Sequence, residues 1–204
     1  MNLFLLTSTF EDSFEYKGIK FRVDLSFDNV LRMFESFDDP FFQGAEKIDL
    51  AFEILVPKYK EMKFESLEEW HSLYKFLLKE FLDIDVDKID KNPKTIFDFK
   101  QDAGIIYASF FNEYGMDLFE QHGKLHWYKF LQLLTHLSDK SKFKTVVGYR
   151  EMEVPSLNKC SQEERDHIIK MKKLYSLNND GYSSESEQIA ALDQKWDNLA
   201  HSLK

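Results

Sequence analysis

Apolar residues recur every three or four positions along most of this chain, which is the spacing of one face of a helix. The clearest example follows Ser66, where the apolar positions are Leu67, Trp70, Leu73, Tyr74, Leu77 and Phe81. The sequence S-L-E-E at residues 66–69 also has the pattern of a capping box, which satisfies free N–H groups at a helix start. We therefore predict an amphipathic helix that begins after Ser66.

The same spacing predicts helices in five other stretches. Their apolar positions are Phe27, Val30, Leu31 and Phe34; Ile48, Ala51, Phe52 and Leu55; Ile105, Ile106, Phe110 and Phe111; Phe143, Val146 and Val147; and Ile168, Met171 and Leu174. A further helix is expected from about residue 124 to residue 137.

Start and stop signals set the expected ends of these helices. The residues that suit an N-cap are Asp28, Asp98 or Asp102, and Ser161. Asp39-Pro40 and Pro57 end the helices before them, because proline cannot continue the backbone ladder. Gly115 suits a left-handed C-terminal cap.

One β signal stands near the N-terminus. Residues 13–16 and 19–25 alternate apolar with polar on both sides of Lys17-Gly18, which predicts a hairpin. With only 7 Gly and 4 Pro, and with 20 Phe to fill a core, the chain favours long helices over a many-stranded fold. We expect a mainly α, multi-helix single domain with a small N-terminal β-hairpin and a C-terminal amphipathic helix.

Polar, turn-rich sequence separates this last helix from the rest. We therefore place a compact helical domain at residues 1–177, and a polar tether with a C-terminal helix at residues 178–204. The apolar seam of that helix is Ile189, Leu192, Trp196, Leu199 and Leu203. Such a seam docks against another helix, either in the same chain, in a second copy or in a partner.

Charge and targeting features limit the classes of partner. The net charge of -9 disfavours a broad nucleic-acid interface, and the short basic runs at residues 140–144 and 170–173 suit solvated helix faces. The N-terminal residues lack the positive region of a signal peptide, and no apolar run approaches the roughly 20 residues that cross a bilayer. The single Cys160 cannot form an internal disulfide. We expect a protein of the cytoplasm that binds neither nucleic acid nor membrane.

No motif points to catalysis. His122 and His126 have a spacing that can hold a metal, but Gly123 lies between them at a helix start, so His126 better suits a buried imidazole with one donated hydrogen bond. The acidic loop with Asp83, Asp85, Asp87 and Asp90 lacks the glycine and glutamate of a calcium loop. We predict no catalytic, cofactor or metal site.

Three stretches resemble the bacteriophage gene-product-fifteen family: QDAGIIYASFFNEYGMDL at 101–118, LHWYKFLQLL at 125–134 and VVGYR at 146–150. YKGIKFRVDLSFDNVLRMFE and EERDHIIKMKKLYSL are also similar to it, so that the resemblance covers most of residues 8–178. The residues that carry it are Asp102, Tyr107, Leu125, His126, Trp127, Tyr128, Tyr149 and Arg150.

The resemblance implies a place in the tail module of siphophages and prophages of Gram-positive hosts, encoded near the tape-measure protein. Tail-assembly chaperones occupy that place. The resemblance therefore implies a chaperone or scaffold for the tape measure in the host cytoplasm, with tail proteins as partners. It brings no catalytic residue with it. The alternatives are a minor structural protein that stays in the tail and an enzyme of unfamiliar type.

Overall fold

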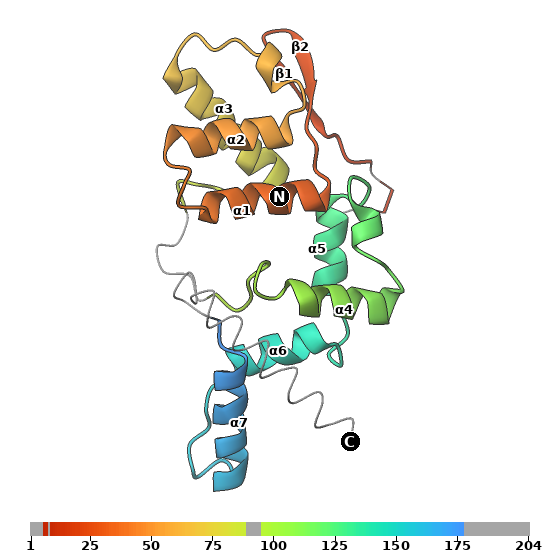
Figure 1. Cartoon of the computed structure of the whole chain (residues 1–204), viewed down its shortest axis with the longest axis vertical. Helices are drawn as coiled ribbons and strands as arrows, with labels where there is room; N and C mark the ends of the chain where they lie inside the picture. Colours follow the sequence, from red (N-terminus) through yellow and green to blue (C-terminus); the bar gives the residue numbers. More distant parts are fainter. Residues whose placement is uncertain (1–5, 8, 89–94, 178–204) are drawn as a thin grey trace. The chain divides into compact units, whose positions relative to one another are not determined.

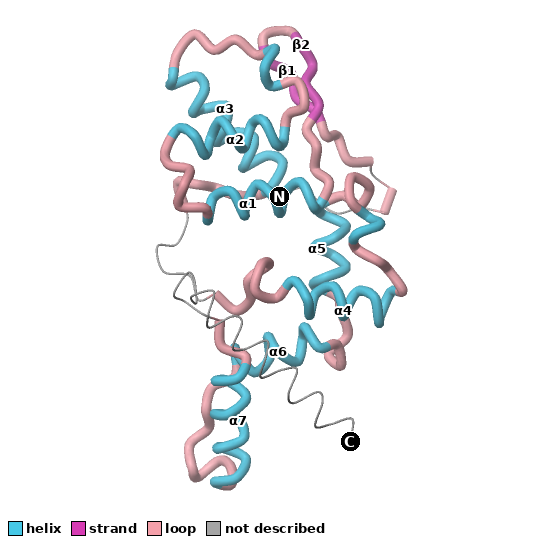
Figure 2. The backbone as a smooth tube through the Cα atoms, in the orientation of Figure 1, coloured by secondary structure: helices cyan, strands magenta, loops and turns pink. Residues whose placement is uncertain are grey.

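The computed structural model describes residues 6, 7, 9–88 and 95–177 (Figure 1). Within these residues it has seven α-helices, two short 3-10 helices and one two-stranded sheet, so the predicted mainly α fold with an N-terminal hairpin is confirmed. Figure 2 shows how little of the described chain is strand. The predicted C-terminal helix lies outside the described residues. None of the described helices is both long enough and apolar enough to cross a membrane.

Contacts along the chain gather into two compact units, residues 1–145 and 146–204. From the sequence we expected one compact domain up to residue 177, and that boundary stays a prediction. In the first unit, α1 contacts both α2 and α5, α2 contacts α3, and α4 contacts α5. Most of these contacts join helices that follow one another in sequence, and the α1–α5 contact brings together segments that lie far apart.

The hairpin pairs β1 (Ser13–Tyr16) with β2 (Ile19–Arg22) in antiparallel register. Lys17 and Gly18 form the turn with φ of 50° and 77°, the left-handed pair that matches the twist of a two-residue hairpin. Phe14 and Phe21 stand opposite each other with ring centroids 5.8 Å apart, and both are buried. The aromatic pair thus fixes which face of the hairpin meets the core.

Helix α1 (Phe27–Asp38) ends at the expected acidic stretch but starts differently. Its N-cap is Ser26, so the prediction of Asp28 as the cap was wrong. Asp28 lies in the first turn, and its carboxylate accepts the backbone N–H of Gly123 at 2.8 Å. Met33 is fully buried although the sequence pattern missed it, whereas Phe34 is only half-buried.

A buried amide links α1 to α2 (Ala45–Leu55). The Asn29 side chain donates to the carbonyls of Asp24 and Ile54 at 3.2 and 2.6 Å. The second acceptor is one of the last carbonyls of α2, which lack partners within the helix. The apolar stripe of α2 is buried as predicted at Ile48, Ala51, Phe52 and Leu55.

Helix α3 (Leu67–Leu82) has half of the predicted capping box. The Ser66 hydroxyl accepts the N–H of Glu69 at 3.1 Å, but the Glu69 carboxylate accepts the N–H of Glu65 at 2.7 Å. Leu67 is 78% exposed, so its assignment to the inner stripe was wrong, since the first turn extends beyond the core. Trp70, Leu77 and Phe81 are buried as predicted. A 3-10 helix, η1 (Tyr59–Glu61), precedes α3.

Helix α4 (Ala103–Tyr114) has Asp102 as its N-cap residue and ends at Gly115 in the left-handed conformation, both as predicted. Phe111 is 51% exposed, so its place on the inner face was wrong. A 3-10 helix, η2 (Phe119–Gln121), then leads to α5 (Trp127–Thr135). The expected span of 124–137 for α5 was too long, because His126 is extended and serves as the N-cap.

Phe130 lies at the centre of an aromatic core in the first unit. Its ring centroid is 4.9 Å from Phe27, 5.3 Å from Phe110 and 5.7 Å from Trp127. Phe110, Phe130 and Trp127 are all buried. The core therefore joins the first turn of α1 to α4 and α5.

Helix α6 (Lys142–Glu151) runs across the boundary between the two units, and α7 (Gln162–Leu174) belongs to the second. The predicted cap Ser161 forms a complete capping box with Glu164. None of the residues of α7 is buried, and Leu174 is 64% exposed, so the prediction of an inner face through Leu174 was wrong. Ile168 and Met171 are half-buried.

Candidate functional site

The Leu125-His126-Trp127 triplet lies where α1 and α5 begin. An isolated antiparallel bridge joins Ser26 to His126. The N–H of Phe27 donates to the carbonyl of Leu125 at 2.9 Å, and the N–H of Trp127 donates to the carbonyl of Leu25 at 2.7 Å. Two helix starts that are about a hundred residues apart are therefore tied together by backbone hydrogen bonds.

The geometry of His126 fixes the position of its ring proton. Nδ1 accepts the backbone N–H of Tyr128 at 3.1 Å, so Nδ1 carries no proton. Nε2 therefore carries it and donates to the Asp12 carboxylate at 3.1 Å. The ring also stacks on Phe10, with centroids 3.9 Å apart and planes at 7°. Protein groups occupy both nitrogens, in agreement with the predicted buried imidazole.

A pH dependence of stability is expected from this ring. Burial lowers the pKa of His126 below its ordinary value of 6.5 and outweighs the opposing effect of Asp12. The unfolded state thus binds the proton more readily than the folded state. The contribution to the free energy of unfolding is complete above pH 6.5 and is lost as the pH falls from there through the lowered pKa.

His126→Asn tests this assignment, because asparagine can keep the N-cap hydrogen bond but does not titrate. Urea unfolding of wild type should show stability falling as the pH drops below 6.5, and the variant should lose that part of the fall. Equal pH profiles for both proteins would contradict the lowered pKa of His126.

The His122 side chain differs from that of His126 because its ring is exposed. Its exposed ring lies 5.6 Å from Phe119 and 5.8 Å from Phe27, so its neighbours are aromatic rings and not metal ligands. The structure does not bring the two histidines together as a pair of ligands, because His126 is committed to Tyr128 and Asp12.

An apolar cavity of about 150 Å³ lies beside α4, and we call it the α4 groove. Its lining residues come from α1, α4, α5 and the segments before and after α4: Phe27, Leu31, Phe99, Ala103, Ile106, Tyr107, Leu118, Phe119, His122 and Phe130. Nearly all of these side chains are aliphatic or aromatic. The groove therefore suits an apolar side chain of a partner.

The rim of the α4 groove exposes large aromatic side chains. Phe119 is 70% exposed and its ring centroid lies 5.4 Å from Tyr107. Phe111 is 51% exposed and packs 6.2 Å from Tyr107. Exposed aromatic side chains that cluster beside a cavity are typical of binding surfaces.

Tyr107 provides a polar group at this rim. It is one of the residues that carry the family resemblance. Its hydroxyl donates to the Asp117 carboxylate at 3.4 Å. Burial raises the pKa of Tyr107, and the charge of Asp117 raises it further. The phenol therefore stays protonated and serves as a hydrogen-bond donor at neutral pH.

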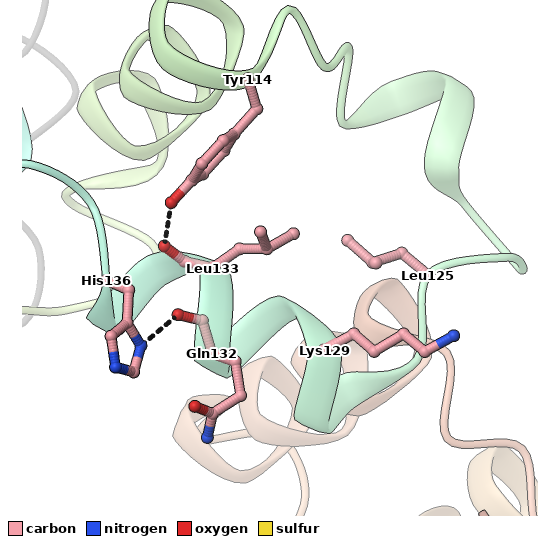
Figure 3. A pocket seen from close by; sticks show the side chains of 6 residues that line it. All are labelled: Tyr114, Leu125, Lys129, Gln132, Leu133 and His136. Atoms are coloured by element: carbon pink, nitrogen blue, oxygen red, sulfur yellow. Dashed lines mark hydrogen bonds between the residues drawn. The ribbon is translucent and has the colours of Figure 1, made fainter. Parts of the chain in front are cut away.

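A second cavity, of about 420 Å³, lies along α5, and we call it the α5 groove. It is lined by Tyr114, Leu125, Lys129, Gln132, Leu133 and His136. Figure 3 shows the Leu125 and Leu133 side chains reaching toward each other beside the Tyr114 ring. The Tyr114 hydroxyl donates to the Leu133 carbonyl at 2.9 Å, and the His136 ring bonds the Gln132 carbonyl at 2.9 Å. These polar groups are thus occupied by backbone.

Neither groove brings together the groups that acyl or phosphoryl transfer requires. In the two grooves, the Tyr107 hydroxyl bonds to a carboxylate, and the Tyr114 hydroxyl and the His136 ring bond to backbone carbonyls. No nucleophile stands next to a general base among the lining residues. What both grooves offer is apolar surface with a few fixed polar groups. That chemistry fits recognition of another chain.

Tyr149 and Arg150 lie in the second unit, where they hold α6 to α7. Arg150 Nε donates to the carbonyl of Tyr175 at 2.5 Å, and Tyr149 lies with its hydroxyl 3.4 Å from His167 Nε2. Lys172 donates to the carbonyls of Tyr149, Arg150 and Met152 at 3.2, 2.8 and 2.6 Å. This part of the family pattern therefore has a structural role.

Comparison with known protein families identifies the family to which this chain belongs. The family model described as Bacteriophage Gp15 protein matches residues 6–177. The chain belongs to the Bacteriophage Gp15 protein family. The comparison with curated proteins found no match, and neither did the comparison with solved structures. Gp15 family membership makes this a bacteriophage protein and indicates a structural or tail-related one.

Proposed function

We propose that this Gp15 family chain is a non-enzymatic tail-assembly protein that acts as a chaperone or scaffold for the tape-measure protein. It works in the host cytoplasm, before the tail is complete, and binds neither nucleic acid nor membrane. The observation that carries the proposal is the α4 groove with the exposed Phe119 on its rim. Family membership supports the phage setting.

The physical need for such a protein arises from the tape measure itself. A long helical chain has apolar stripes that aggregate until the tube subunits enclose it. A partner that covers these stripes keeps the chain available for assembly. An amphipathic helix presents apolar anchors at i, i+3 or i+4, and i+7, and a groove lined by aromatic side chains can receive them.

The α4 groove has suitable dimensions and chemistry for one such anchor. It takes an apolar side chain among Leu118, Ile106 and Phe130, while Phe119 and Phe111 provide contact area at the rim. The net charge of -9 keeps the protein soluble and attracts a helix with basic flanks over a distance. The partner segment in this proposal is an amphipathic helix of the tape-measure protein with basic residues on its flanks.

Two alternative functions would require different properties of the protein. A minor structural protein would use the same surfaces but would stay in the finished tail. An enzyme would need converging reactive groups with perturbed pKa values in a pocket. Tyr107, Tyr114 and His136 have their polar atoms bonded to a carboxylate or to backbone carbonyls, which favours binding over catalysis.

Co-expression with the tape-measure protein tests the proposal. Affinity purification of the tagged chain should recover the tape-measure protein and increase its soluble fraction. The matched control is co-expression with the tail-tube subunit alone, which should not be recovered. Recovery of the tube subunit without the tape measure would contradict the proposed partner.

A further inference from the structure

Helix α5 presents a second helical face at the α5 groove. The residues of α5 that are buried and pack toward α1 and α4 are Trp127, Phe130 and Leu134. A different set, spaced at i, i+3, i+4 and i+7, is exposed or half-buried and lines the α5 groove: Lys129, Gln132, Leu133 and His136. This spacing is that of one face of a helix, so the face can pack against a helix of a partner.

The α5 groove has the size and lining that an apolar anchor requires. Its volume of about 420 Å³ is in the usual range for ligand sites. In Figure 3 the Tyr114 ring lies across from α5, and the side chains of Leu125 and Leu133 reach toward each other. Leu133 is half-buried, so contact with a partner would remove more apolar surface from water. The groove therefore favours an apolar side chain.

Lys129 places a positive charge beside this apolar surface. Among the described residues that line the groove, Lys129 is the only Lys or Arg, and none is Asp or Glu. The Lys129 ammonium lies 5.9 Å from the centre of the Phe10 ring, and it forms no ion pair with a described carboxylate. A carboxylate of a partner can therefore pair with Lys129 without displacing one from this chain.

The rim of the α4 groove has the opposite charge. Asp117 and Glu120 lie close to Phe119 in sequence, and the charges of both carboxylates raise the pKa of Tyr107. At about 0.15 M ionic strength the Debye length is about 8 Å, so the charges beside a groove affect a bound partner more than distant charges do. The two grooves therefore select partner segments of unlike charge.

We propose that the α5 groove binds an acidic amphipathic helix of a partner protein. Lys129 and Leu133 lie about one turn apart on α5, which is about 6 Å along the helix axis. The partner helix therefore has an apolar anchor and an Asp or Glu three or four residues apart. The anchor packs against Leu125, Leu133 and Tyr114, and the carboxylate pairs with Lys129. The proposal goes beyond tape-measure binding, because it concerns another groove and another kind of partner.

Titration calorimetry of the full chain with a synthetic acidic helix tests the proposal. The peptide has leucine at helical spacing and glutamate three or four residues from each leucine. Lys129→Glu should weaken its binding by about fivefold or more, since an attraction becomes a repulsion. Leu133→Ser should weaken it by about tenfold, since apolar contact is lost. Circular dichroism verifies the fold of each variant, and the exposed Lys129 position keeps the test valid if Leu133→Ser does not fold.

Two variants are the matched controls. Lys159→Glu makes the same charge change at an exposed lysine that lines neither groove, and it should bind the acidic peptide as wild type does. Phe119→Ser alters the rim of the α4 groove and should also leave this binding unchanged. Weakened binding in Phe119→Ser would place the peptide in the α4 groove and overturn the proposal. Failure of the proposed tape-measure function would leave the acidic-peptide result unaffected.

A charge exchange tests the pairing with Lys129. A second peptide has lysine in place of each glutamate, and Lys129→Glu should bind it more tightly than wild type does, whereas Lys159→Glu should not. Equal binding of the acidic peptide by wild type and Lys129→Glu would overturn the proposal, as would no binding by wild type. Sedimentation velocity examines a second copy as the occupant. A wild-type dimer that becomes a monomer in Leu133→Ser would assign the groove to self-association and overturn the proposal.

Discussion

Trp127→Ala is expected to lower the free energy of unfolding by about 3 to 5 kcal/mol, the usual cost of removing a buried large aromatic side chain. Trp127 is 4% exposed and packs 5.7 Å from Phe34, 5.8 Å from Phe99 and 5.7 Å from Phe130. Its loss leaves a cavity between α1, α5 and the segment before α4. Chemical unfolding monitored by circular dichroism measures the effect.

Trp70→Phe is a useful comparison, because it changes a buried tryptophan that packs with α2 and η1 and leaves most of the aromatic volume in place. It should cost less than Trp127→Ala. A Trp127→Ala protein with unchanged stability but lost partner binding would move Trp127 from the core to the contact surface.

Phe119→Ser is expected to weaken binding to the tape-measure protein by about 30-fold or more, which corresponds to about 2 kcal/mol for an aromatic anchor. The side chain is 70% exposed in the free protein, so a partner can bury it at the rim of the α4 groove. The free energy of unfolding should stay within about 0.5 kcal/mol of wild type, as for most surface substitutions.

Phe41→Ser is the matched control, because Phe41 is 82% exposed and does not line either groove. Loss of an exposed phenylalanine there should leave binding unchanged. Affinities measured by titration calorimetry with the purified tape-measure protein separate the two variants. Equal weakening in both would show that general surface apolarity, and not the α4 groove, controls binding.

Local signals in the sequence were sufficient to predict most helix ends. Gly115 is left-handed at the end of α4, and Ser161 caps α7, since each of these conformations depends on a few neighbouring residues. The helical stripes of α2 and α3 were also recognisable because burial on one face imposes the spacing. Leu67 and Phe111 broke the pattern, because periodicity alone does not show where a helix projects beyond the core.

The candidate site depended on contacts between distant segments, which the sequence does not show. Ser26 meets His126 through a bridge that joins two loops, and this bridge explains why α5 begins at Trp127. Phe119 lies in a 3-10 helix without a periodic apolar pattern, so it gave no signal as a rim residue. A Phe beside polar residues in a short connection is the one hint that could have identified it.

Mass spectrometry of purified, finished virions tests the central claim most directly, because an assembly chaperone leaves before the tail is complete and a structural protein does not. The proposed function predicts that this chain is found with the tape-measure protein in lysates of infected cells and is missing from the finished particles. Its presence in those particles at a fixed stoichiometric copy number would contradict the chaperone function and assign the chain to the tail structure.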